Sequence, residues 1–290
     1  MKVAIMTDSN SGITQSQAKE LGIFVIPMPF TINREEYKED INLTQQQFYE
    51  MLMNGAEVFT SQPSVGEVTS FFDNILKEYD QIVHIPMSSG LSGSCQTALM
   101  LSEESEYKGK VFVVDSQRVS VTQKYDVLDA IELAKQGKDA KEIRDILVEN
   151  KMNASIYITV NTLEYLKKGG RVTPAAAALG GLLKIKPILS IQGEKLDSFA
   201  KTRTMNKAKT IMIDSIKEDL MNRIDKEHAD FSSSRISVAF TYDLESALEL
   251  KAQLETIFPN HEIGCDPLSL SVACHIGPHS LAIGACKKIL

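Results

Sequence analysis

The stretch Gln81–Ser94, QIVHIPMSSGLSGS, decides the fold, because it joins a mostly apolar run to a loop rich in serine and glycine. Gln81–Met87 is typical of a strand that is buried on both faces of a parallel sheet. The loop after it ends in Ser92-Gly93-Ser94, which we expect to begin a helix with free backbone N–H groups. Glycines allow a close approach to the backbone, and such a helix end favours an anion. The stretch therefore predicts a strand–loop–helix unit that holds a carboxylate or phosphate.

The same pattern recurs three times in the N-terminal half. The apolar runs are Lys2–Met6, Val58–Phe59 and Val111–Val114. Each run ends in a tip of hydroxyl or acidic residues: Thr7-Asp8-Ser9, Thr60-Ser61-Gln62-Pro63-Ser64 and Asp115-Ser116. Capping boxes at Thr14-x-x-Gln17 and Ser64-x-x-Glu67 indicate helix starts between the runs. We therefore predict four parallel strands with crossover helices, whose tips converge at one edge of the sheet.

The second half of the chain shows a different order of elements. We expect an α/β domain over residues 1–153 and an α+β domain over 154–290, with the last residues free to pack back on the first domain. The boundary follows a predicted helix at Ala140–Glu149. The elements expected after it are strand Ser155–Val160, helix Thr162–Lys168, hairpin strands Ile185–Ile191 and Leu196–Thr202, a helix over about 206–224, strand Ile236–Tyr242, helix Glu245–Ile257 and a short strand near His261–Cys265.

Composition narrows the class of protein. With 290 residues, 43% hydrophobic and 24% charged, the chain is long and apolar enough for two cores. Its net charge of -7 argues against nucleic acid as a partner. No apolar stretch is long enough to span a bilayer, and the N-terminus turns polar too early for a signal peptide, so we expect a cytoplasmic protein. We interpret the residues that could be taken for zinc ligands as buried thiols and hydrogen-bonded histidines: Cys274, His275, His279 and Cys286.

Catalytic and cofactor motifs are missing from the sequence. It has no G-x-S-x-G elbow, no phosphate-binding loop of the G-x-x-x-x-G-K-[ST] form and no dinucleotide fingerprint. His84 lies inside an apolar run, where a core role is expected. We therefore expect a binding protein without metal or cofactor, not an enzyme. Two alternatives stay open: an acyl hydrolase that uses Ser92, and a lipid sensor or transport module. Ser92 and Ser94 could also serve only as helix caps, and Thr60 only as a strand end.

Taken together, the tips resemble those of the DegV family of bacterial fatty-acid-binding proteins. Further segments in the family's order are Leu166–Arg171, Ile185–Leu189 with Gly193, Arg203 and His275–His279. The resemblance implies one long-chain fatty acid buried between the two domains. It places the carboxylate on Thr60 and Ser92, with Ser61, Gly93 and His275 in supporting positions.

The resemblance also implies a partner. Members of the family act with a separate fatty acid kinase, which phosphorylates the bound acid to an acyl phosphate. Arg171 and Arg203 match family positions where the kinase or the phosphate is expected, and transient contact with a membrane surface is compatible with this role. Hydroxyls can hold a carboxylate without a full counter-charge, and we hypothesise that this leaves one oxygen nucleophilic.

Two segments depart from the family pattern. Ser94-Cys95 stands where the family commonly has T-Y, and Pro278-His279 where a second small residue is usual. Candidates for the apolar wall around the acyl chain are Phe24, Val25, Ile26, Met28, Phe30, Ile158, Val160 and Ala175–Leu183.

Overall fold

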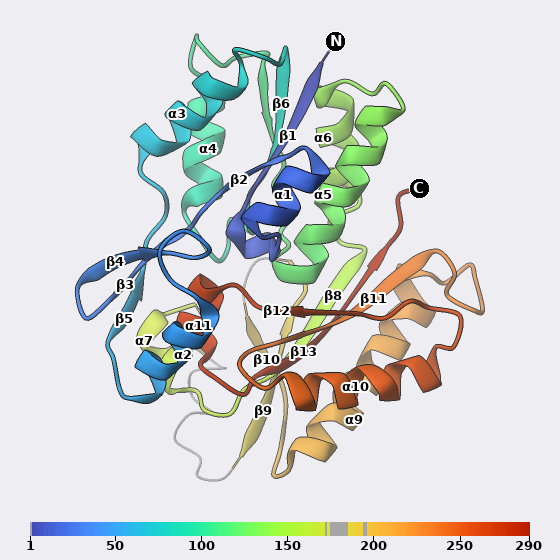
Figure 1. Ribbon diagram of the computed structural model, residues 1–290. Helices are drawn as coiled ribbons and strands as arrows, with labels where there is room; N and C mark the ends of the chain where they lie inside the picture. The colour runs from blue at the N-terminus through green and yellow to red at the C-terminus, as the bar shows by residue number, and fades with distance from the viewer. Residues whose placement is uncertain (1, 172, 175–184, 194–195) are drawn as a thin grey trace.

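The computed structural model describes residues 2–171, 173–174, 185–193 and 196–290. Its N-terminal half contains a four-stranded parallel sheet in the order β2-β1-β6-β7 (Figure 1). The strands are β1 (Val3–Asp8), β2 (Phe24–Ile26), β6 (Gln81–Ile85) and β7 (Val111–Val113). The predicted unit at residues 81–94 is present as strand β6, a loop and helix α4 (Ser94–Ser102). The mixed α/β class is therefore confirmed.

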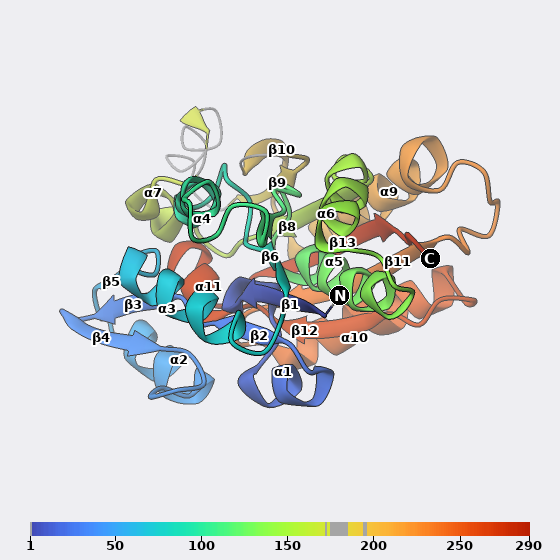
Figure 2. The same ribbon diagram turned by 90° about the horizontal axis from the view of Figure 1, so that it is seen from above.

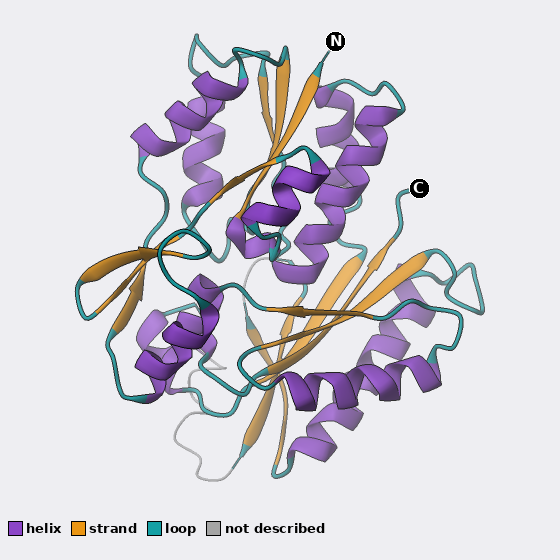
Figure 3. Cartoon of the chain, in the orientation of Figure 1, coloured by secondary structure: helices purple, strands orange, loops and turns teal. Residues whose placement is uncertain are grey.

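Helices cover both faces of this sheet (Figure 3). On one face lie α1 (Gln15–Leu21), α5 (Ser120–Lys135) and α6 (Ala140–Glu149), and on the other α3 (Val65–Ile75) and α4. Both predicted capping boxes form: the side chains of Thr14 and Ser64 each accept from the backbone N–H three residues on. Val68 and Phe72 of α3 are buried against the sheet. Local capping thus accounts for where α1 and α3 begin, and apolar spacing for the face that α3 buries.

The strand at residues 58–60 corrects one prediction. Strand β5 (Val58–Thr60) does not join the parallel sheet. It pairs antiparallel with β3 (Pro29–Ile32), which also pairs with β4 (Glu35–Lys38), in a separate three-stranded sheet. Helix α2 (Gln45–Met53) packs on this sheet. A run as short as Val58-Phe59 carries no periodicity, so its pairing partner could not be derived locally.

The C-terminal half contains a six-stranded mixed sheet in the order β10-β9-β8-β13-β11-β12. The strands are β8 (Ala154–Thr159), β9 (Lys186–Ile191), β10 (Asp197–Thr202), β11 (Ser234–Phe240), β12 (Gly264–Pro267) and β13 (Leu281–Lys287). The predicted hairpin is present as β9 and β10, although Glu194 and Lys195 of its turn lie outside the described residues. Strand β13 was not predicted, yet it lies between β8 and β11.

One face of this sheet is covered by helices α9 (Met205–Asp219) and α10 (Leu244–Ile257), with a π-helical turn at Leu220–Ile224. Its other face points toward the N-terminal half, and α5 lies between the two sheets (Figures 1 and 2). Polar contacts fix α5 to the C-terminal strands: Lys124 with Asp266 (2.8 Å), Tyr125 with Ser237 (2.6 Å), and Asp129 with Arg235 (2.6 Å).

The described residues of the C-terminal half also form two short helices, α7 (Glu164–Gly169) and α11 (Leu270–Ile276). Helix α11 packs against the three-stranded sheet of the other half, and Ile289 packs against the core under α5 and α6. The division of the chain at residue 153 therefore stays a prediction, since contacts cross it at both places. No helix among the described residues is both long and apolar enough to cross a membrane.

Candidate functional site

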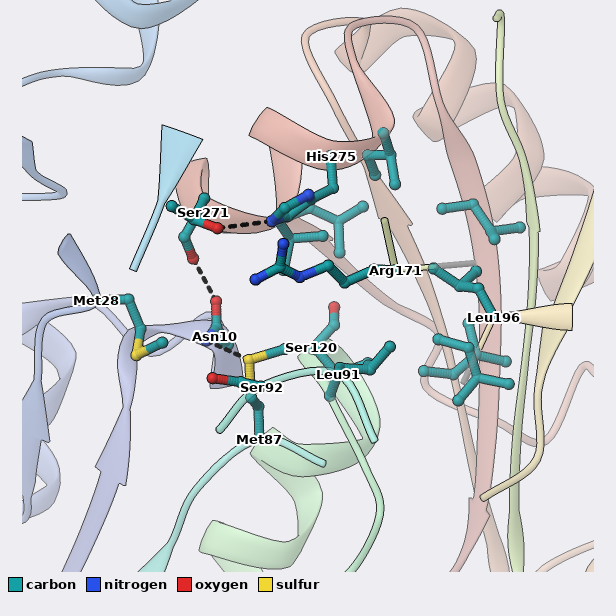
Figure 4. Close-up of a pocket in the computed structure, with 18 of the residues that line it drawn as sticks. Asn10, Met28, Met87, Leu91, Ser92, Ser120, Arg171, Leu196, Ser271 and His275 are labelled. Carbon is teal, nitrogen blue, oxygen red and sulfur yellow. Dashed lines mark hydrogen bonds between the residues drawn. The ribbon is translucent and has the colours of Figure 1, made fainter. Parts of the chain in front are cut away.

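A cavity of about 240 Å³ lies between the inner face of the C-terminal sheet and the loops at the carboxyl edge of the parallel sheet. Its walls are mainly aliphatic. The sheet contributes Ile156, Ile158, Ile191, Ala239 and Ala282, and on the facing side lie Met87, Leu91 and Val119 of the loops and Val121 of α5. Figure 4 shows Asn10, Ser92, Ser271 and His275 gathered around the guanidinium of Arg171, with Leu196 at the opposite end. The cavity thus has one polar end and a long apolar part.

Most of the residues predicted for the site meet in this cavity. Thr60, Ser61, Ser92, Gly93, Arg171 and His275 all line it. Among them Ser61 and Gly93 are exposed, so the polar end reaches the protein surface. Arg203 is different, because it follows β10 as an exposed residue and is not part of the lining. Its contact with a partner protein stays a prediction.

Thr60 and His275 come from opposite halves of the chain and meet at the polar end. Thr60 Oγ1 lies 2.8 Å from Nε2 of His275. Thr60 is positioned by strand pairing with Phe30, and His275 by the last turn of α11. Helix α7 packs so closely on this turn that a Cβ at Gly169 would lie 2.0 Å from Nδ1 of His275. Glycine at residue 169 is therefore what lets the imidazole reach Thr60.

His275 is held in its neutral form. Burial, with a smaller contribution from the positive charge of Arg171, lowers the pKa of His275 to about 4. A neutral imidazole has one N–H donor and one acceptor nitrogen. When Nε2 carries the proton, it donates to Thr60 Oγ1, and the hydroxyl proton of Thr60 is then free to donate to a ligand. In this tautomer Nδ1 is the acceptor nitrogen. It is buried without a hydrogen-bond partner among the described residues.

Arg171 supplies the charge of the site. Among the described lining residues it is the only Arg, Lys, Asp or Glu. Its Nη1 donates to the carbonyl of Gly169 at 2.5 Å, which fixes the side chain and leaves its other N–H groups for an anion. The sequence-based hypothesis that hydroxyls alone hold a carboxylate stays a prediction. Arg171 lines the same cavity as Thr60 and Ser92, so a carboxylate bound at the polar end would also have a guanidinium available.

The loop before α4 combines capping with ligand access. Ser92 Oγ accepts from the backbone N–H of Ser94 at 3.2 Å, which leaves its own proton free to donate. The two interpretations of Ser92, as a cap and as a ligand residue, are therefore compatible. A Cβ at Gly93 would lie 2.7 Å from Oε1 of Gln62, whose amide donates to Thr97 (3.0 Å). Because residue 93 has no side chain, Gln62 can pass close to the loop at the polar end of the cavity.

Sequence reasoning missed a polar pair at the same end. Asn10 lines the cavity and accepts hydrogen bonds through Oδ1 from the hydroxyls of Ser269 (2.9 Å) and Ser271. Asp8 positions it by accepting from its backbone N–H at 3.0 Å, and burial raises the pKa of Asp8 to about 6. Asn10 directly follows a predicted tip and could have been included with it. Ser271 has no local signal, since its place depends on how α11 packs.

The predicted apolar wall is only partly correct. Met28 and Ile158 line the cavity. The candidates that belong to other hydrophobic cores are Phe24, Val25, Ile26 and Phe30. Val160 packs in the same hydrophobic cluster as Met28 and Ile158 but does not line the cavity. Ala175–Leu183 lies outside the described residues. The residues at the two departures from the family pattern do not line the cavity. Cys95 is buried on the inner side of α4, and the ring of His279 lies edge-to-face with that of Tyr242, with 4.9 Å between the ring centroids.

The geometry gives no support to a hydrolytic serine. In the part of the chain that the structure describes, Ser92 has no hydrogen bond to a histidine, and His275 is engaged with Thr60. His84 is buried within β6, where burial lowers its pKa to about 4. No three His, Cys, Asp or Glu side chains of the described residues cluster as metal ligands would.

The fold and the site define an α/β protein with a cavity between its two larger sheets, which has a polar end at the surface and an apolar part between the sheets. The chain belongs to the DegV family, whose model matches residues 2–288.

Relatives and solved structures agree with this assignment. Protein DegV of Bacillus subtilis is 30% identical over 290 residues, which cover 99% of this chain and 100% of the relative. The crystal structure of DegV, a fatty acid binding protein from Bacillus subtilis, has a TM-score of 0.85 at 30% identity and covers 99% of this chain and 100% of that one. A fatty acid binding DegV family protein from Thermus thermophilus has a TM-score of 0.87 at 26% identity, with the same coverage.

Proposed function

We propose that this protein binds one long-chain fatty acid, with the carboxylate at Arg171, Thr60 and Ser92 and the acyl chain along the inner face of the C-terminal sheet. The observation that carries the proposal is a cavity with aliphatic walls and a single cationic side chain, among its described residues, at one end. The similar proteins from Bacillus subtilis and Thermus thermophilus that are described as fatty acid binding support it.

Burial of the acyl chain provides the affinity. Each buried methylene contributes about 0.8 kcal/mol, so a chain of about 16 carbons contributes roughly 12 kcal/mol before the costs of association and ordering. The head group then sets the direction of binding. A carboxylate among aliphatic side chains would lose its hydration, whereas at the polar end it accepts from Thr60, Ser92 and Arg171.

We further propose that the bound acid is presented to a fatty acid kinase. A carboxylate oxygen attacks the γ-phosphorus of ATP, an O–P bond forms, and the bond to the ADP oxygen breaks, giving an acyl phosphate and ADP. The kinase supplies the nucleotide and magnesium, and this chain supplies the positioned nucleophile. The exposure of Ser61 and Gly93 beside the polar end supports the idea, since the reacting oxygen must be reached from outside.

Native mass spectrometry tests the first part of the proposal. The purified protein should carry a mass excess equal to one fatty acid, or should take up one added fatty acid when it is stripped. A protein that is empty and also refuses added fatty acid would refute the proposal. If the purified chain alone formed acyl phosphate from ATP and fatty acid, the role of the kinase would be wrong instead.

A charge reversal at Arg203 tests the second part of the proposal, the presentation of the acid to a kinase. The side chain is exposed and does not line the cavity, so Arg203→Glu should leave fatty acid affinity unchanged. If Arg203 contacts the kinase, the charge reversal should lower the rate of phosphorylation at least several-fold, and more at low salt. An unchanged rate at low salt would remove it from the partner interface.

Transient contact with a membrane surface is also proposed, so that acyl chains can be exchanged with a bilayer. Phe59 supports it, because its side chain is 64% exposed directly before Thr60. Phe59→Ser should reduce flotation with anionic vesicles, and equal flotation of both proteins would argue against contact at this residue.

A further inference from the structure

Two cavities lie end to end along the inner face of the C-terminal sheet. Beyond Ile156 and Ile191 the large cavity is followed by a second one of about 10 Å³. These two residues line both cavities, and they are paired with each other across strands β8 and β9. Among the described residues of β8, Ile158 lines only the large cavity and Ala154 only the small one. The pair Ile156–Ile191 is therefore a partition between the two.

The partition lies at the end of the cavity away from the carboxylate site. Residues on one face of a strand repeat at about 6.6 Å, and β8 runs from Ala154 toward α7, whose last residue contacts His275. Ile158 is therefore nearer the polar end than Ile156. At the level of Ile156 the neighbouring residue on β13 is Gly284, where a Cβ would lie 2.7 Å from Val121 of α5. Helix α5 thus closes on the sheet at the partition.

The space beyond the partition is unsuited to an acyl chain. The residues with polar side chains around it are Gln117, Arg118, Thr122, Lys151 and Ser155. Arg118 is 2% exposed; it donates to Asp126 (2.6 Å) and to the carbonyl of Asn150 (2.8 Å), and its Nε has no partner among the described residues. A cavity of this size holds about one water molecule. A terminal methyl group placed there would separate buried donors from their hydration.

We propose that the partition Ile156–Ile191 sets the longest acyl chain that the protein binds well. The inference rests on the proposed fatty acid function and adds the residues that determine chain length. Affinity should rise about fourfold for each added methylene until the terminal methyl meets the partition, and should stop rising or fall for longer chains. Ile191→Ala removes Cγ1, Cγ2 and Cδ1, so the limit should move out by about three carbons, as far as Arg118 allows.

The experiment measures Kd for a series of saturated fatty acids from about 12 to about 22 carbons. The proteins compared are wild type, Ile191→Ala, Ile156→Ala and the control Ile188→Ala. Ile188 lies on β9 but is buried in the core on the other face of the sheet, so its truncation removes the same atoms without touching the cavity. The length limit should increase by about three carbons in the two partition variants and stay unchanged in the control.

Three outcomes decide the matter. An unchanged limit in folded Ile191→Ala and Ile156→Ala proteins would overturn the partition while leaving fatty acid binding intact. An equal shift in the Ile188→Ala control would overturn it too, because loosening of the sheet would then explain the change. Failure of the wild type to bind any chain length would overturn the proposed function itself. If the alanine variants do not fold, Ile191→Val removes one methyl group and should still move the limit by about one carbon.

Discussion

Replacement of Arg171 by methionine tests how the head group is held. The change keeps a long side chain in the lining and removes the only charged side chain among the described lining residues. A hydrogen bond between charged groups contributes about 1.5–3 kcal/mol, which corresponds to a loss of about 10- to 150-fold in affinity. Because Arg171 is only partly buried and its Nη1 already donates to Gly169, the lower part of this range is expected.

Comparison of a fatty acid with the primary alcohol of the same length separates charge from packing. Wild type should prefer the acid, and Arg171→Met should lose affinity for the acid by about tenfold or more while binding the alcohol unchanged. Arg171→Lys should be intermediate, because an ammonium keeps the charge without the planar fork. The imidazole signals of His275 give a second measurement. Its pKa is lowered by burial and also by Arg171, so the pKa should rise in the methionine variant.

The reasoning has clear points of failure. Equal losses for acid and alcohol would mean that Arg171 shapes the cavity and does not compensate charge. An unchanged affinity for the acid in Arg171→Met would place the carboxylate elsewhere. A His275 pKa that does not rise would show that the guanidinium lies farther from the imidazole in solution than in the structure.

Three further changes are predicted. Thr60→Val should weaken fatty acid binding about fivefold, because valine has nearly the volume of threonine but lacks the hydroxyl donor. Equal Kd values for the two proteins in calorimetry would contradict this. Gly169→Ala should displace His275, since the added Cβ would lie 2.0 Å from its Nδ1, and a crystal structure with the Thr60 contact preserved would show the prediction wrong. Glu39 accepts from Leu270 N–H at 2.9 Å, and burial raises the pKa of Glu39 from 4.5 to about 7. Between these values the native state keeps a proton that the unfolded state has released, so the free energy of unfolding should fall as pH rises through this window, by up to about 3 kcal/mol. Glu39→Gln should lose this part of the pH dependence in urea denaturation at about pH 5 and about pH 8, whereas the same slope in both proteins would contradict the assignment.

The parts of the fold that were predicted correctly rest on local interactions. The unit at residues 81–94 combines an apolar run, a glycine-containing loop and a helix start within 14 consecutive residues. The capping boxes at Thr14 and Ser64 depend on residues only three positions apart. For the same reason the tips were good guides to the site, since the carboxyl ends of parallel strands and the loops that follow them meet at one edge.

The incorrect or missing parts depend on contacts between distant segments. Strand β5 ends in a polar tip like the others, but it pairs with β3 and brings Thr60 to the cavity from a separate sheet. Strand β13 is not distinguished locally from other short apolar runs, and its place between β8 and β11 depends on pairing across more than 40 residues. Val25, Ile26 and Phe30 pack in other hydrophobic cores, and hydrophobicity alone could not distinguish such core residues from residues of the cavity wall.

The sequence by itself determined the strand–loop–helix unit at residues 81–94, the α/β class and the residue types of the loop that lines the cavity, because caps, glycine conformations and apolar spacing act between neighbours along the chain. Only the tertiary structure decided that Thr60 meets His275, that Arg171 places its charge in the cavity, and that Ile156 and Ile191 close its far end. These features arise where two sheets and the helices between them pack. Their geometry follows from strand register and side-chain volume, which the sequence of any one segment leaves open.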